Sequence, residues 1–315
     1  MRIFHSVLPE TDCIYTLIFV SIWSLLYDES IFPDPHQFKP ERFLSPDEQQ
    51  LEKVQMFLPF GTVAVPASLG VLAGSSVTDS FPVLKKLVRK YRNIDENVFD
   101  FIREVRGMMK KSIEETKPNL SEHSAEDSRY LVEYYLNEMK HNATNTMSEN
   151  DLTIIGLDFI AATVNSVNSI LEFCFMYLIL NPWVQDKLHK EIDEVLGTRK
   201  IHLGTDKHRL HYLQAVINEV IRINTIAPMT ATHRCTQHTD FYGYRIPKGT
   251  PNSVYCKRIC PGDQLTRQIL LIYLTTLLQN YSVHRAPHDP LPDTRAQAGF
   301  VNSPKPFRVI LRERN

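Results

Sequence analysis

Two cysteines, Cys256 and Cys260, lie four residues apart in a basic stretch near the end of the chain. Lys257 and Arg258 stand between them, and residues 261–263 (PGD) lead into an apolar stretch with helical spacing. Neighbouring cations and the N-terminus of a helix favour the thiolate over the thiol, and the thiolate is the form that binds metals. The chemistry that this stretch predicts is metal ligation by one of the two sulfurs.

The remaining cysteines, Cys13, Cys174 and Cys235, are irregularly spaced. Five cysteines in 315 residues are too few for a disulfide framework, so a reducing compartment is the default expectation. A cysteine and histidine metal module would need more ligands at regular spacing than the sequence offers. Two interpretations remain for Cys260, a single metal ligand or an ordinary structural or exposed thiol, and Cys256 is taken as incidental.

Glu219 and Arg222 lie three residues apart in a stretch of helical apolar spacing, which places both side chains on one helical face where they can pair. A pair of this kind is most often a simple surface ion pair. Residues 31–44 hold three prolines and include Arg42 within the stretch 38–43 (FKPERF). We expect this segment to be an ordered, extended meander packed on the surface of the core.

The clearest helical signal runs from Ser148 to the stop at Asn181-Pro182. Ser148 and Asp151 have the spacing of a capping box, and a helix of this length measures roughly 45–50 Å. Its surface is apolar almost all round, which predicts that it crosses a protein interior, while its acidic residues argue against a membrane span. Residues 165–169 (NSVNS) interrupt the apolar surface, either as a locally satisfied packing kink or as a groove facing a ligand.

Periodicity predicts several further elements. They are helices over 95–115, 183–196, 213–221 and 264–279, a hairpin over 239–250 and a strand over 305–313. The apolar run over 13–27 is too short to span a bilayer comfortably and has neither a basic flank nor a cleavage site, so we expect a buried strand rather than a targeting segment. The fold class is therefore mainly α with a minor β part.

Composition limits the possible partners. With 43% hydrophobic residues, the chain can bury a large core. The formal net charge is -1, so the chain has no broad positive field. Binding to nucleic acid through release of counterions is not expected.

Several of these stretches together resemble the cytochrome P450 family, the haem-thiolate monooxygenases, in its animal microsomal form. Residues 257–263 (KRICPGD) are similar to that family's haem loop, and residues 57–61 (FLPFG) to the stretch ahead of it. Residues 38–43 and the Glu219–Arg222 pair are similar to the two halves of one buried charged network. The similarity covers roughly residues 16–250 and 257–315.

The resemblance implies a haem site built around Cys260 as the ligand of the iron. Arg234 and Arg258 fall where family members bind the haem propionates, a task suited to a guanidinium fork. Phe60 belongs to the stretch ahead of the haem loop, and Gly262 would let the backbone approach the macrocycle closely. Haem is therefore the implied cofactor.

The resemblance also implies a structural triad and an oxygen-activation motif. Glu219, Arg222 and Arg42 would form the triad that pins the loop beneath the haem. Counting back from the helix stop aligns Asn165 and Ser166 with the family's catalytic acid and hydroxyl. An asparagine at the place of the acid can form hydrogen bonds but cannot ionise, which would weaken proton delivery.

The order of the segments departs from the family's order. The stretch 246–250 (IPKGT) would normally lead into residues 17–62, and residue 62 into the cysteine loop at 257. The resemblance thus implies one partial P450-like helical domain over 1–315, incomplete because the N-terminal sheet and early helices have no counterpart. Its parts are a displaced segment over 16–62, middle helices over 63–250, and the cysteine loop, next helix and final strands over 257–315.

The implied activity is insertion of one oxygen atom from dioxygen into a lipophilic small molecule. Electrons would come from NADPH through NADPH-cytochrome P450 reductase. The resemblance implies the endoplasmic reticulum membrane, although the chain shows no convincing anchor and a soluble cytoplasmic location is the alternative. The competing hypothesis is a non-catalytic remnant or mis-assembled gene model that binds no haem, because the displaced segment removes the short tether of the cysteine loop.

Overall fold

The computed structural model describes residues 18–19, 26–52, 54, 57, 94–120, 128, 130–141, 148–227, 233–241, 244–253, 260, 262–298 and 301–314. The chain divides into two compact units. The larger unit holds residues 1–64 and 165–315, and the smaller unit holds residues 65–164. The single domain expected from the sequence stays a prediction.

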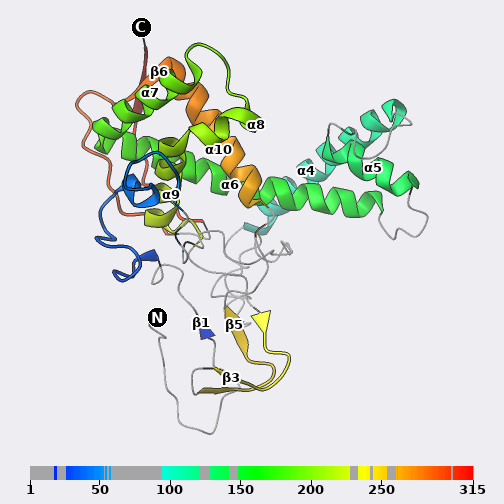
Figure 1. The fold of residues 1–315 in the computed structure, drawn as a ribbon. Coiled ribbons are helices and arrows are strands. Elements are labelled where there is room, and N and C mark those ends of the chain that lie inside the picture. Colours follow the sequence, from blue (N-terminus) through cyan, green and yellow to red (C-terminus); the bar gives the residue numbers. More distant parts are fainter. Residues whose placement is uncertain are drawn as a thin grey trace. The chain divides into compact units, whose positions relative to one another are not determined.

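The larger unit is built on helices that share one hydrophobic core. Figure 1 shows α7 (Pro182–Leu196), α9 (His211–Asn224) and α10 (Asp263–Asn280) gathered around the C-terminal part of α6 (Glu149–Leu180). Helix α9 is buried on all sides, so it carries both apolar and charged side chains into the interior. The short helices α8 (Leu203–Asp206) and η6 (Lys207–Arg209) lead into it.

Local sequence signals set the ends of α7. It begins at Pro182, whose missing N–H has no partner in the first turn of a helix in any case. It ends at Gly197, which has a φ of 57° and donates its N–H to the carbonyl of Asp193. A positive φ costs glycine little, which explains why the helix stops at this residue. The helix expected over 183–196 is thereby confirmed.

The segment over residues 26–52 packs against these helices, as predicted for the meander. It forms a short 3-10 helix, η2 (Pro40–Phe43), and the side chains of Phe32 and Phe43 are 1% exposed. Phe38 stacks on Tyr177 of α6 with ring centroids 4.3 Å apart. The proline-rich stretch is therefore anchored to the core by aromatic side chains.

The described part of the larger unit also holds three small sheets. β1 (Ile18–Phe19) pairs in parallel with β5 (Pro251–Ser253), and β2 (His233–Arg234) pairs with β5 in the antiparallel sense. β3 (Thr239–Phe241) and β4 (Tyr244–Ile246) form the predicted hairpin, and β6 (Tyr281–Arg285) pairs with β7 (Val309–Glu313). The displaced N-terminal segment thus lies alongside the strand that follows residue 250.

The smaller unit contains α4 (Ile94–Thr116), η4 (Lys117–Asn119), α5 (Leu131–His141) and the first half of α6. Buried residues from all three helices form its core, among them Val105, Tyr135 and Leu157. A Cβ on Gly156 would lie 2.3 Å from the methyl carbon of Met109, so the glycine permits the close contact of α6 with α4.

The ends of α6 agree with the sequence expectation. Ser148 donates its N–H to Asp151 at 2.9 Å, and Asp151 donates its N–H to the Ser148 hydroxyl at 3.2 Å, which completes the predicted capping box. The Ser148 hydroxyl also donates to the Asp151 carboxylate at 2.6 Å, and this hydrogen bond lowers the pKa of the Asp151 carboxyl.

The expectation that α6 crosses an interior holds only in part. Its most apolar window has a mean hydropathy of 1.5, and only 33% of that window is buried. By length and composition α6 could cross a membrane, a property that core helices of soluble proteins share. Ile154 and Val164 are 36% and 47% exposed, so one side of the helix is open among the residues that the structure describes.

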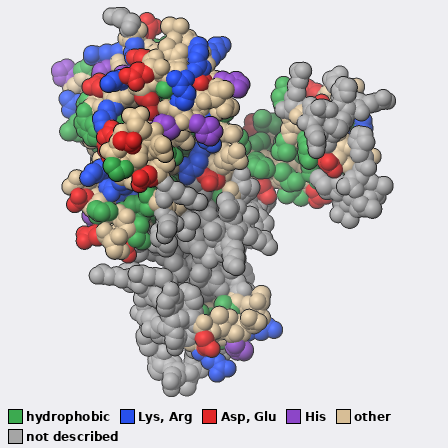
Figure 2. Space-filling view, in the orientation of Figure 1, with side chains coloured by type: hydrophobic (Ala, Val, Ile, Leu, Met, Phe, Trp, Pro, Cys, Tyr) green, Lys and Arg blue, Asp and Glu red, His purple; other side chains and the backbone are tan. Residues whose placement is uncertain are grey.

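Charged side chains of both signs are mixed over the face of the larger unit shown in Figure 2. This distribution agrees with the formal net charge of -1. It offers no single-sign surface on the visible face that would attract a nucleic acid.

Candidate haem-thiolate site

The cysteine that the sequence singled out stands at the start of α10. Cys260 is a free, half-buried cysteine three residues ahead of the helix. Asp263, the first residue of α10, donates its N–H to the Cys260 carbonyl at 3.2 Å. The sulfur therefore belongs to a turn that feeds directly into a helix N-terminus, where the helix dipole favours an anion.

Gly262 lies beside this sulfur. A Cβ at Gly262 would lie 3.7 Å from Cys260 Sγ and 3.9 Å from Thr266 Oγ1, which are ordinary contact distances. Among the described residues, the missing side chain of Gly262 thus leaves space beside the sulfur that a larger residue would fill. A free thiol with such space beside it, just ahead of a helix N-terminus, is a donor that fits a haem iron.

The charged pair expected from the sequence is present and fully buried. Glu219 and Arg222 of α9 both have 0% exposure. Arg222 donates from Nε to Glu219 Oε2 at 2.7 Å and from Nη2 to Glu219 Oε1 at 2.9 Å. The guanidinium fork thus binds both oxygens of the carboxylate. Because both side chains are buried, this is not the simple surface ion pair that is the commonest outcome of such spacing.

Arg42 joins this pair from the N-terminal segment. Its Nε lies 3.2 Å from Glu219 Oε2, in a charge contact rather than an aligned hydrogen bond. Its other nitrogens donate to the carbonyls of Pro33, Asp34 and Gln37. The structure therefore brings together all three residues of the predicted triad, and their role in holding a haem loop stays a prediction.

Main-chain groups complete the charged cluster. Arg222 also donates to the carbonyls of Leu26 and Pro35, each at 2.8 Å, and the N–H of Lys39 donates to Glu219 Oε1 at 2.9 Å. The guanidinium carbon of Arg222 lies 5.6 Å from the ring centroid of Tyr27. These contacts fasten the N-terminal segment to α9 across 180 to 196 residues of sequence. Burial raises the pKa of the Tyr27 hydroxyl.

Sequence reasoning missed a second link, which joins the N-terminal segment to α7 as well as to α9. Lys187 of α7 lies 3.2 Å from Glu41 and 3.3 Å from Glu48, and the Tyr212 hydroxyl of α9 donates to Glu41 at 3.2 Å. Glu41 is the acid of the FKPERF stretch, so the motif marked the place. Nothing in the local pattern indicated that Lys187, 146 residues away, would be its partner.

The other predicted site residues are less fully defined. Asn165 is exposed and Ser166 is half-buried on α6, which is helical throughout 149–180. The main chain of Arg234 belongs to β2, where it pairs with Pro251. Phe60 and Arg258 lie outside the described residues. Their predicted contacts with haem stay predictions.

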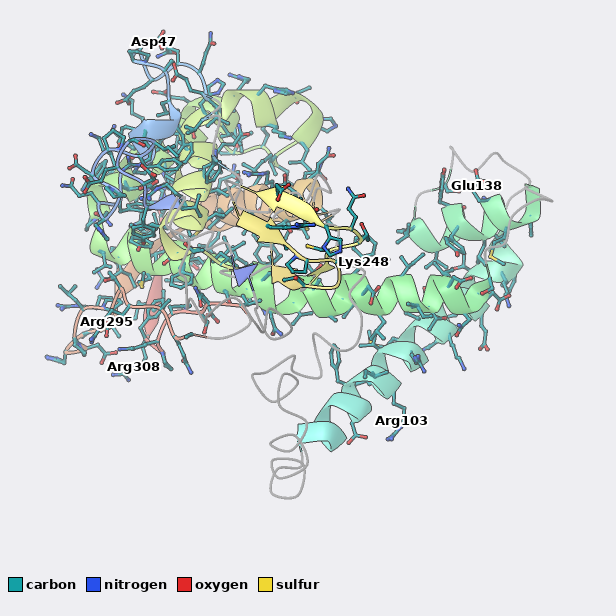
Figure 3. All side chains as sticks on the ribbon, turned by 90° about the horizontal axis from the view of Figure 1, so that it is seen from below. Asp47, Arg103, Glu138, Lys248, Arg295 and Arg308 are labelled. Carbon is teal, nitrogen blue, oxygen red and sulfur yellow. The ribbon has the colours of Figure 1, made fainter. Side chains whose placement is uncertain are left out.

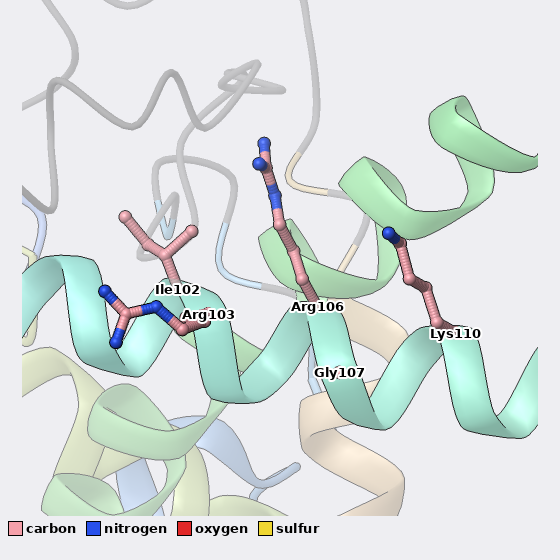
Figure 4. A pocket seen from close by; sticks show the side chains of 5 residues that line it. All are labelled: Ile102, Arg103, Arg106, Gly107 and Lys110. Carbon is pink, nitrogen blue, oxygen red and sulfur yellow. The ribbon is translucent and has the colours of Figure 1, made fainter.

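Two hollows are separate from the cysteine. One of about 530 Å³ in the larger unit is lined by Tyr27, His36, Tyr177 and Asn302 among others, and the described lining does not include Cys260. The other, of about 460 Å³, lies on α4 in the smaller unit and is lined by Ile102, Arg103, Arg106, Gly107 and Lys110 (Figure 4). Arg103 of this lining pairs with Asp100 at 2.8 Å, and the described lining includes no thiol.

Comparisons with known proteins agree with the motifs. A family model described as Cytochrome P450 matches residues 15–62, 71–257 and 255–311. Cytochrome P450 2U1 of Bos taurus is 29% identical over 65% of this chain and 45% of its own length. The Homo sapiens protein of that name is 28% identical over 72% and 48%. Farnesoate epoxidase of Bombyx mori is 27% identical over 65% and 49%. The chain spans about half the length of these curated relatives.

Solved structures share the fold. A zebra fish cytochrome P450 with abiraterone has a TM-score of 0.62 and 22% identity, covering 74% of this chain and 63% of that chain. A second, with progesterone, has a TM-score of 0.62 and 21% identity, covering 70% and 60%. The predicted fold class, mainly α with small sheets, is thereby confirmed.

Proposed function

This chain belongs to the cytochrome P450 family, and from that premise we propose that it acts as a haem-thiolate monooxygenase in which Cys260 ligates the iron. The observation that carries the proposal is a free thiol in the turn that leads into α10, in a unit that also holds the buried Glu219, Arg222 and Arg42 cluster. Electrons would come from NADPH through NADPH-cytochrome P450 reductase, and the proposed location is the endoplasmic reticulum membrane.

Five residues would hold the haem. Cys260 supplies the thiolate, Gly262 leaves space beside it, and Arg234 and Arg258 meet the propionates. Phe60, which lies outside the described residues, would contribute from the segment that precedes the cysteine loop in the family's order. The triad would act on the haem site indirectly, because it fastens the N-terminal segment to α9.

Haem bound through a thiolate supplies the activation of dioxygen, so that one oxygen atom enters an apolar substrate and the other leaves as water. Asn165 and Ser166 of α6 are the chain's own groups for handling protons at that step. An amide and a hydroxyl can orient a water molecule but carry no acidic proton near neutral pH. We therefore expect proton delivery to be slow in comparison with an enzyme that has a carboxylate at position 165.

Lipophilic small molecules are the proposed substrates. Two probes follow from the relatives: farnesoate, which the silkworm relative's name identifies as a substrate for epoxidation, and progesterone, which accompanies one of the similar zebra fish structures. Both are predominantly apolar, as a substrate for a dry cavity above a haem must be.

Two observations favour a second candidate, a helical protein without catalytic activity. The chain spans about half the length of its curated relatives. Residues 16–62 also precede the middle helices instead of leading directly into the cysteine loop, which removes the short tether that would hold this loop. In this alternative the charged cluster stabilises the fold and Cys260 is an ordinary thiol.

Oxygenation of a probe separates the two candidates. The purified chain would be reconstituted with haem and NADPH-cytochrome P450 reductase, then given farnesoate or progesterone under heavy-oxygen-labelled dioxygen. We expect a product that has gained one labelled oxygen atom and depends on NADPH. Mass spectrometry measures the mass shift.

Cys260→Ser and Cys235→Ser form a matched pair of variants, because both residues are half-buried cysteines. Product should disappear in the first variant and remain in the second. Equal product from both variants would assign the activity to free haem and favour the non-catalytic candidate.

A further inference from the structure

A polar bridge joins the start of α10 to α9. Arg267 Nε donates to Asp263 Oδ1 at 2.7 Å, one turn along the same helix. Arg267 Nη1 donates to Asn218 Oδ1 of α9 at 2.5 Å. One guanidinium thus binds two acceptors on different helices through different nitrogens, a geometry that its rigid fork permits and a lysine ammonium could not reproduce.

The two ends of the bridge lie beside residues already described. Asp263 donates its N–H to the carbonyl of Cys260, so its position is coupled to the cysteine turn. Asn218 is 6% exposed and directly precedes Glu219 in α9. The bridge is itself half-buried, with side-chain exposures of 27% for Arg267 and 33% for Asp263, so water weakens it only in part.

We propose that Arg267 is a positioning residue that holds the Cys260 turn against α9 through Asp263 and Asn218. This positioning role rests on the proposed function, because a fixed sulfur matters when it has to ligate an iron. The geometry explains why an arginine is needed: its fork reaches both the first turn of α10 and the buried face of α9.

The buried leucines of α10 act farther from the sulfur. Leu270, Leu274 and Leu278 bury the helix in the core, but the first of them lies ten residues beyond Cys260. Loss of the bridge should therefore loosen the first turn of α10 and leave the rest of the helix packed. Cys260 would then become more accessible while the core stays closed.

Alkylation of the cysteines tests the proposal without haem. The full chain would be treated with iodoacetamide near pH 9.5, about one unit above the usual cysteine pKa of about 8.5, so that a cysteine that becomes exposed to water reacts readily. Peptide mass spectrometry follows each cysteine separately. Cys174 is 1% exposed, and burial raises the pKa of its thiol to about 12, so its rate reports opening of the core.

Arg267→Leu and Asn218→Leu should each raise the rate at Cys260 by about three- to tenfold relative to Cys174, as loss of a charge-assisted hydrogen bond implies. The double variant should be no faster than the faster single variant, because both changes break one bridge. Arg308→Leu is the control. Arg308 is labelled in Figure 3, is exposed, and pairs with Asp289 on the C-terminal segment.

The outcomes are distinct. A change below about twofold at Cys260 would overturn the positioning role, because the bridge would then not hold the cysteine turn. An equal rise at Cys260 and Cys174 would also overturn it, because the bridge would then contribute only to the general stability of the fold. Haem titration of the unmodified chain tests the proposed function separately. Failure of that titration leaves the alkylation result intact, so the two failures can be told apart.

Discussion

Replacement of Arg222 by methionine should destabilise the larger unit strongly. Arg222 is 0% exposed, and its guanidinium donates to both oxygens of Glu219 and to the carbonyls of Leu26 and Pro35. Methionine fills similar space but leaves the buried carboxylate of Glu219 without its bidentate partner. Breaking a buried ion pair from one side costs about 3–5 kcal/mol.

The structure places the expected loss near the lower end of that range. Glu219 keeps the charge of Arg42 at 3.2 Å and the N–H of Lys39 at 2.9 Å. Each of these contacts compensates part of the charge that the buried carboxylate would otherwise carry unpaired, so we expect a loss of about 3–4 kcal/mol. With a urea slope of about 3 kcal/mol/M, the unfolding midpoint should fall by about 1 M.

Urea unfolding followed by far-ultraviolet circular dichroism measures this shift. The matched control is the double variant Glu219→Leu with Arg222→Met, which removes the carboxylate together with its bidentate partner. The double variant should be no less stable than Arg222→Met alone, because its interior holds no uncompensated carboxylate. A single variant within about 1 kcal/mol of the parent, or a double variant that loses the sum of both single effects, would refute the reasoning.

Two further outcomes follow from the same structure. Asp206→Asn should lower the urea midpoint at neutral pH. The Arg199 guanidinium holds the Asp206 pKa well below its usual range, so the carboxylate stabilises the fold above about pH 4, and the difference between parent and variant should shrink as the pH falls; a constant difference down to low pH would exclude this cause. Asn165→Asp should raise the rate of NADPH-dependent oxygenation by about tenfold or more, since proton transfer by a positioned acid typically contributes about a hundredfold or more; an unchanged rate would remove position 165 from proton delivery.

Local signals in the sequence predicted the helices well. The Ser148 and Asp151 capping box begins α6, and Asn181-Pro182 separates it from α7. Each signal involves only a few neighbouring residues, so it does not depend on the tertiary contacts of the rest of the chain. Helix α5 was missed because its exposed apolar residues, Leu131 and Tyr134, blur the periodicity on which a sequence prediction relies.

Long-range contacts were less predictable. The resemblance indicated that Arg42 and Glu219 meet, but the carbonyl partners of Arg222 lie 187 and 196 residues away and carry no side-chain signature. The parallel pairing of β1 with β5 was equally hidden, because two-residue strands have almost no pattern of their own. Residue types predicted the kind of site, and tertiary packing decided its partners.

The exposed side of α6 shows a further limit of periodicity. An apolar surface all round predicted a helix enclosed by protein, yet Val164 is 47% exposed. Periodicity reports the faces that a helix can bury, and it does not report whether those faces are covered. The neighbouring Asn165 is exposed as well, so the choice between a packing kink and a ligand-facing groove stays open for experiment.

The most direct measurement is the absorption spectrum of the haem-reconstituted chain after reduction and addition of carbon monoxide. Ligation by the Cys260 thiolate requires the strongly red-shifted Soret band that thiolate-ligated haem produces, in the parent and in Cys235→Ser but not in Cys260→Ser. The same band in all three proteins, or its absence from the parent, would contradict the assignment of Cys260 as the iron ligand.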